Sequence, residues 1–297
     1  MATEPNWMAD QFEEHREHLR GVAYRMLGSA SDADDAVQDA WLRVSRADTG
    51  DVVNLRAWLT TVVARVSLNM LRSRNSRRQD VVETDEFLHL LRDESSDTEQ
   101  EAVLADSVGL ALLVVLERLN PAERLAFVLH DMFDLPFEEI APIVGRSPTA
   151  ARQLASRARR RVRGGDETSA TDADVHRRRE VVEAYLAATR RGDFSALLAM
   201  LDPDVVLRVD FPGEGTRHDL RGAHALLDRS RDFSRAARFC RVVLLDGNPG
   251  LIMAPMGRMA RAISFSFTGE KISSIEVIAD PERLRRLRVS MPGTDVR

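Results

Sequence analysis

Residues 136–163 read PFEEIAPIVGRSPTAARQLASRARRRVR, and this stretch predicts two helices joined by a tight turn. Gly145 stands where the first helix would end, Ser147 can cap the second, and Pro148 suits a first position that needs no backbone N–H. Apolar residues recur at helical spacing and would form the inner faces: Phe137, Ile140, Ala141 and Val144, then Ala151, Leu154, Ala155, Ala158 and Val162.

The open face of the second predicted helix is polar and basic, and no acidic residue occurs between Arg146 and Arg163. A short helix, a turn with glycine and an arginine-rich helix are typical of a helix-turn-helix that enters the major groove. Arginines would contact phosphates while the leading side chains reach base edges. A basic helix on a solvated surface is the alternative interpretation. The open-face residues are Thr149, Arg152, Gln153, Ser156, Arg157, Arg159, Arg160, Arg161 and Arg163.

Length and composition set the outer bounds. A chain of 297 residues suggests two or three domains. The net charge of −5 argues against a nucleic-acid binder, but the charge is segregated: Arg72–Arg78 is basic and Asp80–Glu101 is acidic. Local patches set the field that a phosphate backbone meets. The average net charge therefore does not exclude a protein that binds nucleic acid.

Several classes of protein are not expected. No apolar run approaches the roughly 20 residues of a membrane span, and the N-terminus lacks the pattern of a signal peptide. Cys240 is the single cysteine, and His15, His18 and His130 lack partners at metal-ligand spacing. We expect a cytoplasmic protein with no membrane contact, no metal and no cofactor.

The N-terminal part predicts three helices: about Ala9–Leu27, Ser31–Arg46 and Leu55–Arg74. Ser31 would cap the second, with Asp34 completing a start like a capping box. That helix buries Ala33, Ala36, Val37, Ala40, Trp41 and Val44, and it leaves outward Asp32, Asp35, Gln38, Asp39, Leu42 and Arg43. An exposed leucine among carboxylates suits a partner with basic residues, although a solvated face is the commoner explanation.

The third predicted helix has one apolar face and carries arginines along its length, with further arginines after it at Arg77 and Arg78. Cations at a helix C-terminus are also favoured by the macrodipole, but six arginines exceed what that effect needs. The apolar face would consist of Leu55, Trp58, Leu59, Val62, Val63, Val66 and Met70 or Leu71.

The rest of the chain divides at two polar linkers, Asp80–Glu101 and Gly164–Asp174. Helices are predicted between them at about Ala102–Leu119 and Pro121–Phe133. After the second linker, three helices precede four alternating segments, which predicts an α+β domain with helices on one curved antiparallel sheet. The helices are Val175–Arg191, Asp193–Leu201 and Gly222–Ser234; the strands are Phe239–Leu245, Gly250–Met256, Ala260–Thr268 and Ile272–Ala279, with a hairpin turn at Thr268–Lys271.

The order of these parts resembles the extracytoplasmic-function sigma factors of bacterial RNA polymerase. The resemblance covers roughly Phe12–Arg78 and Leu110–Arg163. It rests on SDADDAVQDAWLRV, RAWLTTVVARVSLNMLRSR, LNPAERLAFVLHDMFDLPFEEIA and ARQLASRARRRV. It implies a protein that binds core RNA polymerase and directs promoter recognition and transcription initiation.

The resemblance also assigns sites residue by residue. Core-polymerase binding would fall on Asp35, Gln38, Asp39 and Leu42. The −10 element would be read by Arg56, Trp58, Thr61, Arg65, Asn69 and Arg72, with core packing as the alternative for Trp58. The −35 element would be read by Thr149, Arg152, Gln153, Ser156, Arg157, Arg159 and Arg160.

The C-terminal third resembles the SnoaL-like, NTF2-type cone that a subset of these sigma factors carries. Asp280, Pro281, Glu282 and Arg283 match an NPDK-type motif of that subset, whereas its WLPEP-like signature is missing from Asp80–Glu101. The expected domains are two all-helical ones, region 2 at 9–79 and region 4 at 106–164, and an α+β cone at 175–288, with linkers at 80–105 and 165–174.

Related cones include enzymes that move a proton with a carboxylate or histidine. Asp210, His218, Asp219 and His224 are the candidates here, but no second group is placed beside any of them, so we expect no catalytic residue. Asp246 would be a turn residue and Cys240 a core residue. The favoured hypothesis is a regulatory domain that docks within the chain on the sigma domains. The alternative is a helix-turn-helix regulator with a ligand-binding or enzymatic SnoaL-like domain.

Overall fold

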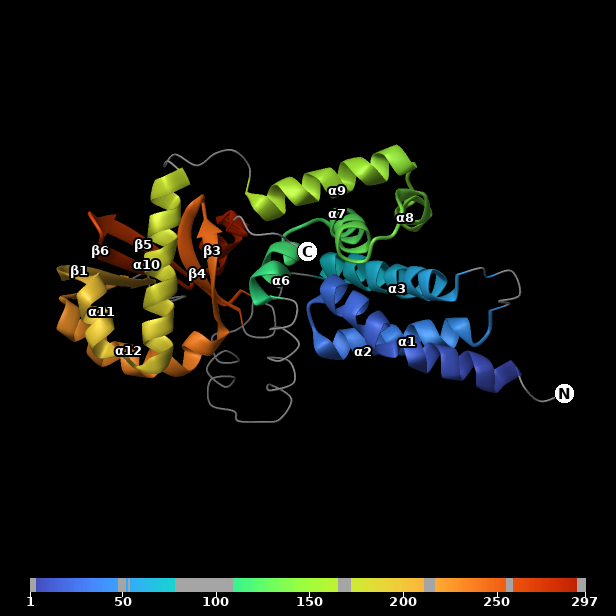
Figure 1. The fold of residues 1–297 in the computed structure, drawn as a ribbon, viewed down its shortest axis with the longest axis horizontal. Helices are drawn as coiled ribbons and strands as arrows, with labels where there is room; N and C mark the ends of the chain where they lie inside the picture. Colours follow the sequence, from blue (N-terminus) through green and yellow to red (C-terminus); the bar gives the residue numbers. More distant parts are fainter. Residues whose placement is uncertain are drawn as a thin grey trace. The chain divides into compact units, whose positions relative to one another are not determined.

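The computed structural model describes residues 4–47, 52, 54–77, 109–164, 172–210, 217–254 and 259–292. They belong to two compact units (Figure 1). One unit combines Met1–Asp80 with Leu116–Arg161, and the other consists mainly of Val162–Thr294. The fold class predicted from the sequence, helical domains followed by an α+β domain, is confirmed. The acidic linker lies outside the described residues.

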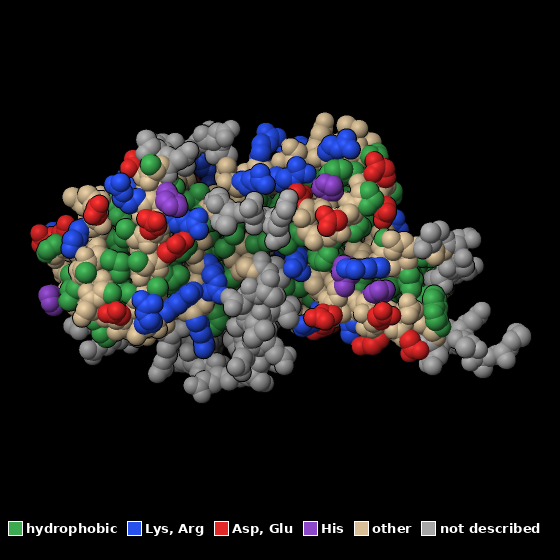
Figure 2. All heavy atoms as spheres, in the orientation of Figure 1, with side chains coloured by type: hydrophobic (Ala, Val, Ile, Leu, Met, Phe, Trp, Pro, Cys, Tyr) green, Lys and Arg blue, Asp and Glu red, His purple; other side chains and the backbone are tan. Residues whose placement is uncertain are grey.

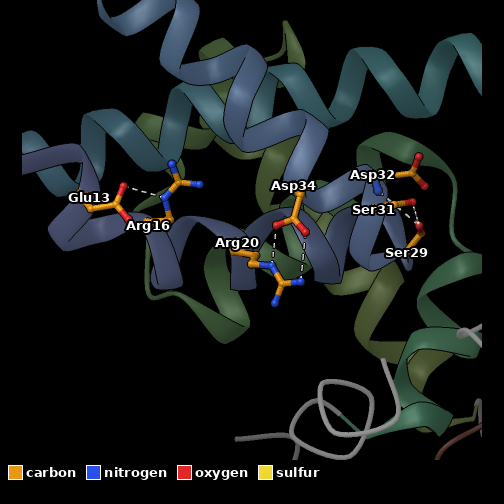
Figure 3. A network of polar contacts seen from close by, with 7 residues as sticks. All are labelled: Glu13, Arg16, Arg20, Ser29, Ser31, Asp32 and Asp34. Atoms are coloured by element: carbon orange, nitrogen blue, oxygen red, sulfur yellow. Dashed lines mark hydrogen bonds and ion pairs between the residues drawn. The ribbon is translucent and has the colours of Figure 1, made fainter. Parts of the chain in front are cut away.

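Three helices open the first unit: α1 (Glu4–Leu27), α2 (Ala30–Val44) and α3 (Leu55–Arg77). The predicted cap of α2 is wrong. Ser29, whose backbone is extended, accepts a hydrogen bond from the Asp32 N–H, because the helix begins at Ala30 and leaves Ser31 inside its first turn. Asp34 instead ties α2 to α1 by accepting two hydrogen bonds from Arg20, at 2.6 and 3.2 Å (Figure 3).

Helix α3 is buried on two sides. It packs against α1 and α2, and also against α7 (Pro121–Phe127) and α8 (Phe137–Val144) (Figure 1). Of the predicted apolar face, Leu59, Val63 and Val66 are buried, whereas Leu55, Trp58, Val62, Met70 and Leu71 are half-buried. Outside that face, Thr60, Ala64, Ser67 and Leu68 are buried. The hydroxyls of Thr60 and Ser67 donate to the carbonyls of Arg56 and Val63, so their burial leaves no donor unpaired. The single apolar face predicted for α3 is therefore incomplete.

The helix-turn-helix agrees with its prediction. Gly145 ends α8 in the left-handed region (φ 68°), and α9 spans Pro148–Arg163. The Ser147 hydroxyl accepts from the Ala150 N–H at 3.2 Å, as a cap should. All inner-face residues predicted for the two helices are buried: Phe137, Ile140, Ala141 and Val144, with Ala151, Leu154, Ala155, Ala158 and Val162.

The segment before the helix-turn-helix differs from its prediction. The helix expected at Pro121–Phe133 ends at Phe127, and a π-helical turn follows at Val128–Met132. The N–H of Leu135 bonds the carbonyl of Leu129, and Asp134 takes a positive φ of 55°, so the chain turns there. The preceding helix, α6, is described over Leu110–Glu117. Residues 102–108, where that helix was also predicted, lie outside the described part.

The second unit contains helices packed on one sheet. Helices α10 (Asp172–Arg191), α11 (Phe194–Met200) and α12 (Ala223–Ala236) contact its strands. The described strands form a seven-stranded sheet in the order β2-β1-β6-β5-β4-β3-β7. The four predicted strands are confirmed as β3 (Cys240–Leu245), β4 (Asn248–Met253), β5 (Arg261–Thr268) and β6 (Lys271–Ile278).

The sheet is mixed, not purely antiparallel. Strand β1 (Leu201–Asp210) runs parallel to β6, and β2 (Arg217–Arg221) pairs with β1 at the edge. Leu201, predicted as the last residue of a helix, has an extended backbone (φ −86°, ψ 144°), so α11 ends at Met200 and β1 starts at Leu201. The short β7 (Val289–Ser290) and helix α13 (Pro281–Arg286) were not predicted.

The core of this unit lies between the helices and the sheet. Tyr185 of α10 packs edge to face on Phe265 of β5, with ring centroids 5.3 Å apart. Cys240 is fully buried there, and burial raises the pKa of its thiol to about 12, which confirms it as a core residue. Asp246 lies between β3 and β4 with a φ of 48°, which confirms the predicted turn.

Candidate functional site

The outward face of α2 carries the predicted polymerase-binding residues. Asp35, Gln38, Asp39 and Leu42 line one surface pocket of about 410 Å³ together with Met70 of α3. Leu42 is 48% exposed, although large apolar side chains are usually covered. Met70 was predicted only as an inner-face residue, with Leu71 as the alternative. Its place at the edge of the α3 apolar face, one turn after Val66, could have indicated this second role.

Five of the six predicted −10 residues share one stripe of α3. Their spacing of three or four residues places them along one side of the helix, away from its two buried faces. Arg65, Asn69 and Arg72 are exposed, and Trp58 and Thr61 are half-buried. The sixth residue, Arg56, lies apart from them against α1, where its Nη2 is 3.0 Å from Nδ1 of His18.

His18 is held in the neutral form by its surroundings. Arg56 can only donate, so Nδ1 of His18 accepts and the ring proton lies on Nε2, which is 3.0 Å from the Thr60 hydroxyl. Burial, followed by the charge of Arg56, lowers the pKa of His18 from 6.5 to about 4. The rings of His18 and Phe133 also pack nearly perpendicular to each other, with their centroids 5.2 Å apart. Sequence reasoning treated His18 only as a possible metal ligand.

The predicted −35 residues lie on α9. Thr149, Arg152, Gln153, Ser156, Arg157 and Arg160 are exposed, and Arg159 is half-buried. Figure 2 shows Lys and Arg side chains gathered over this helix. The sequence pattern thus places the open face correctly, with Arg159 at its margin.

Carboxylates behind α9 bind several of its arginines. Glu123, only 2% exposed, accepts a hydrogen bond from Arg161 at 2.5 Å and lies 3.8 Å from Nε of Arg157. Asp131, in the π-helical turn, lies 2.6 Å from Nε of Arg159. These carboxylates offset part of the positive charge that a DNA phosphate would meet. Sequence reasoning missed them, because Glu123 and Asp131 precede the basic stretch by many residues.

The motif residues of the C-terminal unit form a structural cluster. Asp280 caps α13 by accepting from the N–H of Arg283 at 2.7 Å, and Pro281 is the first helical residue. The Arg283 side chain binds Asp210 at 2.6 Å and Glu276 at 2.8 Å. Glu282 is exposed. The motif thus fastens α13 to the ends of β1 and β6.

Among the candidate proton-transfer residues with described side chains, Asp210, Asp219 and His224, no hydrogen bond or ion pair joins two of them. Asp210 accepts from Arg283 and from the N–H groups of Ala279, at 2.5 Å, and Asp280, at 3.3 Å. A carboxylate bound by three donors is committed to the fold. Asp219 and His224 are exposed on β2 and α12, and the side chain of His218 lies outside the described part.

The described residues contain neither a metal-binding cluster nor a membrane-spanning helix. No group of three or more His, Cys, Asp or Glu side chains among them could hold a metal ion. None of the described helices is both long and apolar enough to cross a membrane.

Comparisons with known proteins identify two family matches and several similar proteins. The Sigma-70 region 2 family model matches residues 11–77, and the Sigma-70 region 4 model matches residues 109–162. The ECF RNA polymerase sigma factor SigJ of Mycobacterium tuberculosis is 43% identical over 207 residues, which cover 69% of this chain and 65% of SigJ. The probable ECF RNA polymerase sigma factor SigI of the same species is 34% identical over 283 residues, 94% of this chain and 95% of SigI.

Among solved structures, the crystal structure of M. tuberculosis SigJ is similar to the chain at 31% identity. It covers 93% of this chain and 98% of its own, with a TM-score of 0.44.

Proposed function

The chain belongs to the extracytoplasmic-function RNA polymerase sigma factors, and we propose that it binds core polymerase and reads promoter DNA through three separate surfaces. The observation that carries this proposal is the arrangement of the first unit. A half-exposed leucine among carboxylates, an exposed arginine stripe on α3 and the basic face of α9 all lie on one helical body.

The α2 surface suits a protein partner. Leu42 offers an apolar anchor, and Asp35 and Asp39 beside it offer charges for a basic rim. Interface energy concentrates in such central anchors surrounded by polar contacts. We assign core-polymerase binding to Asp35, Gln38, Asp39 and Leu42, with Met70 completing the pocket.

The α3 stripe suits the −10 element, and α9 suits the −35 element. Opened DNA strands need a cationic track and surfaces on which bases stack, which Arg65, Arg72 and Trp58 can supply. A duplex element is read in the major groove, where arginine and glutamine side chains can pair with guanine and adenine. Arg152 and Gln153, near the start of α9, hold the positions at which recognition helices contact bases.

The two DNA surfaces must separate for both elements to be bound together. Elements centred at −10 and −35 are about 25 base pairs apart, or about 85 Å at 3.4 Å per pair. A compact body of about 125 residues is only about 35 Å across. We infer that α7 and α8 leave α3 when the protein engages polymerase and promoter.

We propose that the C-terminal unit modulates this activity and does not catalyse a reaction. A covalently attached domain docks at a high effective concentration, and Asp210 is committed to the fold.

Run-off transcription with purified core polymerase tests both parts of the proposal. Full-length protein should direct specific initiation only when core enzyme is present, and a chain ending at Gly164 should initiate at a different level. A protein that binds promoter DNA tightly without core enzyme and yields no specific transcript would contradict the sigma-factor surfaces. Identical activity of the two chains would contradict the modulating role.

A further inference from the structure

We propose that Phe137 is a positioning residue for promoter reading: its ring, stacked with His130, holds the Arg152 guanidinium in the orientation in which it meets a base edge. This inference rests on the proposed −35 role of α9. Phe137 is the first residue of α8 and Arg152 lies in the second turn of α9, so the contact joins the two helices of the helix-turn-helix.

The three side chains form a stack. Cζ of Arg152 lies over the Phe137 ring, 5.2 Å from its centroid. The centroid of the His130 ring lies 3.9 Å from the centroid of the Phe137 ring, and the angle between the two ring planes is 32°. Phe137 is only 6% exposed, whereas Arg152 is exposed. The buried ring is therefore a fixed support for a cation that faces solvent.

The π-helical turn places His130 in this stack. Nδ1 of His130 lies 3.0 Å from the carbonyl oxygen of Leu135, which fixes the plane of the ring by a hydrogen bond that Nδ1–H donates. Single π-helical turns are rare and often mark functional sites. Here the turn brings His130 next to the first residue of the helix-turn-helix and places the Asp131 carboxylate next to Arg159.

Arg152 differs in kind from its neighbours on α9. Arg157, Arg159 and Arg161 face the carboxylates of Glu123 and Asp131. Within the described residues, Arg152 forms no ion pair with a carboxylate, and its partner is a neutral ring. Stacking on an aromatic face orients a guanidinium without neutralising it. Because the side chain is already ordered, it loses less rotamer entropy when it pairs with a base.

A double-mutant cycle on the holoenzyme tests the proposal. The probe is a promoter duplex that the wild-type holoenzyme selects from a pool randomised at the −35 element, and the control duplex has that element scrambled. Phe137→Leu should weaken binding to the selected duplex about three- to tenfold, the range of a cation–π contact, and leave the scrambled duplex unaffected. In an Arg152→Ala background, the same substitution should have no further effect, and Phe137→Tyr, which keeps the ring, should restore binding.

Additive effects of Phe137→Leu and Arg152→Ala, or equal losses on both duplexes, would overturn the positioning role. If Arg152→Ala binds both duplexes as the wild type does, the −35 role of Arg152 fails as well.

An NMR measurement on the free full-length chain tests the stack without DNA. It therefore still tests the proposal if one of the variants fails to fold. The Arg152 side-chain resonances should show an upfield ring-current shift in the wild type. Its absence would overturn the stack whatever the binding data show.

Discussion

Nε of Arg124, in α7, donates a hydrogen bond to the carbonyl oxygen of Arg25, at the end of α1, over 3.1 Å. The last carbonyls of a helix have no partner within it, and a cation there is favoured by the macrodipole. Arg124 is 3% exposed. The Arg25 guanidinium lies over Phe133, 5.2 Å from the ring centroid, and adds a second contact between the same two parts of the chain. These residues join the helix-turn-helix region to the N-terminal helices.

Arg124→Met should loosen this junction. Methionine keeps the apolar stem but leaves the Arg25 carbonyl without its buried donor, so the free energy of unfolding should fall by about 1–3 kcal/mol. Urea unfolding would measure this loss, and small-angle scattering should show a larger radius of gyration for the full chain. Arg146→Met, in the exposed turn before α9, is the matched control and should change neither quantity. Unchanged stability of Arg124→Met would show that this hydrogen bond does not hold the helix-turn-helix region against the N-terminal helices.

His18 should make the first unit less stable in mild acid. Its pKa is about 4 in the folded protein and 6.5 when unfolded, so the unfolded chain binds more protons between these values. The stabilising contribution is therefore complete above pH 6.5 and is lost as the pH falls toward 4. Because His18 is partly exposed, the loss should be about 1 kcal/mol after solvent screening. Protonation would set the ring against Arg56, Arg25 and His15.

The measurement is the free energy of unfolding from pH 7.5 to 4.5 in the wild type and in His18→Gln, which cannot take up a proton. The two proteins differ only at residue 18, so the difference between the two curves reports on His18. Parallel curves would contradict the lowered pKa.

Asp210 should behave as a structural residue. Asp210→Asn removes the charge that Arg283 and the N–H groups of Ala279 and Asp280 share, so the C-terminal unit should lose about 2 kcal/mol of unfolding free energy. Asp219→Asn is the control, since Asp219 is exposed and its ion pair with Arg208 is long, at 3.8 Å. Calorimetry of the full chain would distinguish the two. Equal stability of Asp210→Asn and the wild type would reopen a role for Asp210 in chemistry.

Local signals explain what the sequence could predict. The helix-turn-helix was readable because Gly145, Ser147 and Pro148 each have a backbone reason for their place, and the inner face follows one period. Strand β5 could be predicted because Ile263, Phe265 and Phe267 alternate with serines. Strands β3 and β4 are short apolar runs bounded by turn residues, which also favour a strand. The exposed apolar position on α2 could be predicted because Leu42 lies among polar residues on the outward face of that helix.

Contacts between distant segments explain what was missed. Besides Leu68, the extra buried residues of α3 are Thr60, Ala64 and Ser67, which are small or polar and give little apolar signal. Helix α3 also contacts α7 and α8, which lie far along the chain. The partner of an arginine on α9 cannot be read from α9, since Glu123 lies in α7. Strand β1 pairs with β6 across the domain, and no local pattern specifies that partner.

Leu42 offers the sharpest test of the polymerase surface, because its exposure separates binding from folding. Leu42→Ser removes apolar area that is already half in water, so the melting temperature should hardly change. If Leu42 anchors the interface, affinity for core polymerase should fall tenfold or more, the loss typical of a hot spot. Trp7, at 52% exposure, is the other large exposed apolar side chain among the described residues, and it does not line the pocket. Trp7→Ser should therefore leave polymerase affinity unchanged. Equal losses in the two variants, measured by fluorescence titration with core enzyme, would indicate nonspecific apolar binding and not a site built by α2.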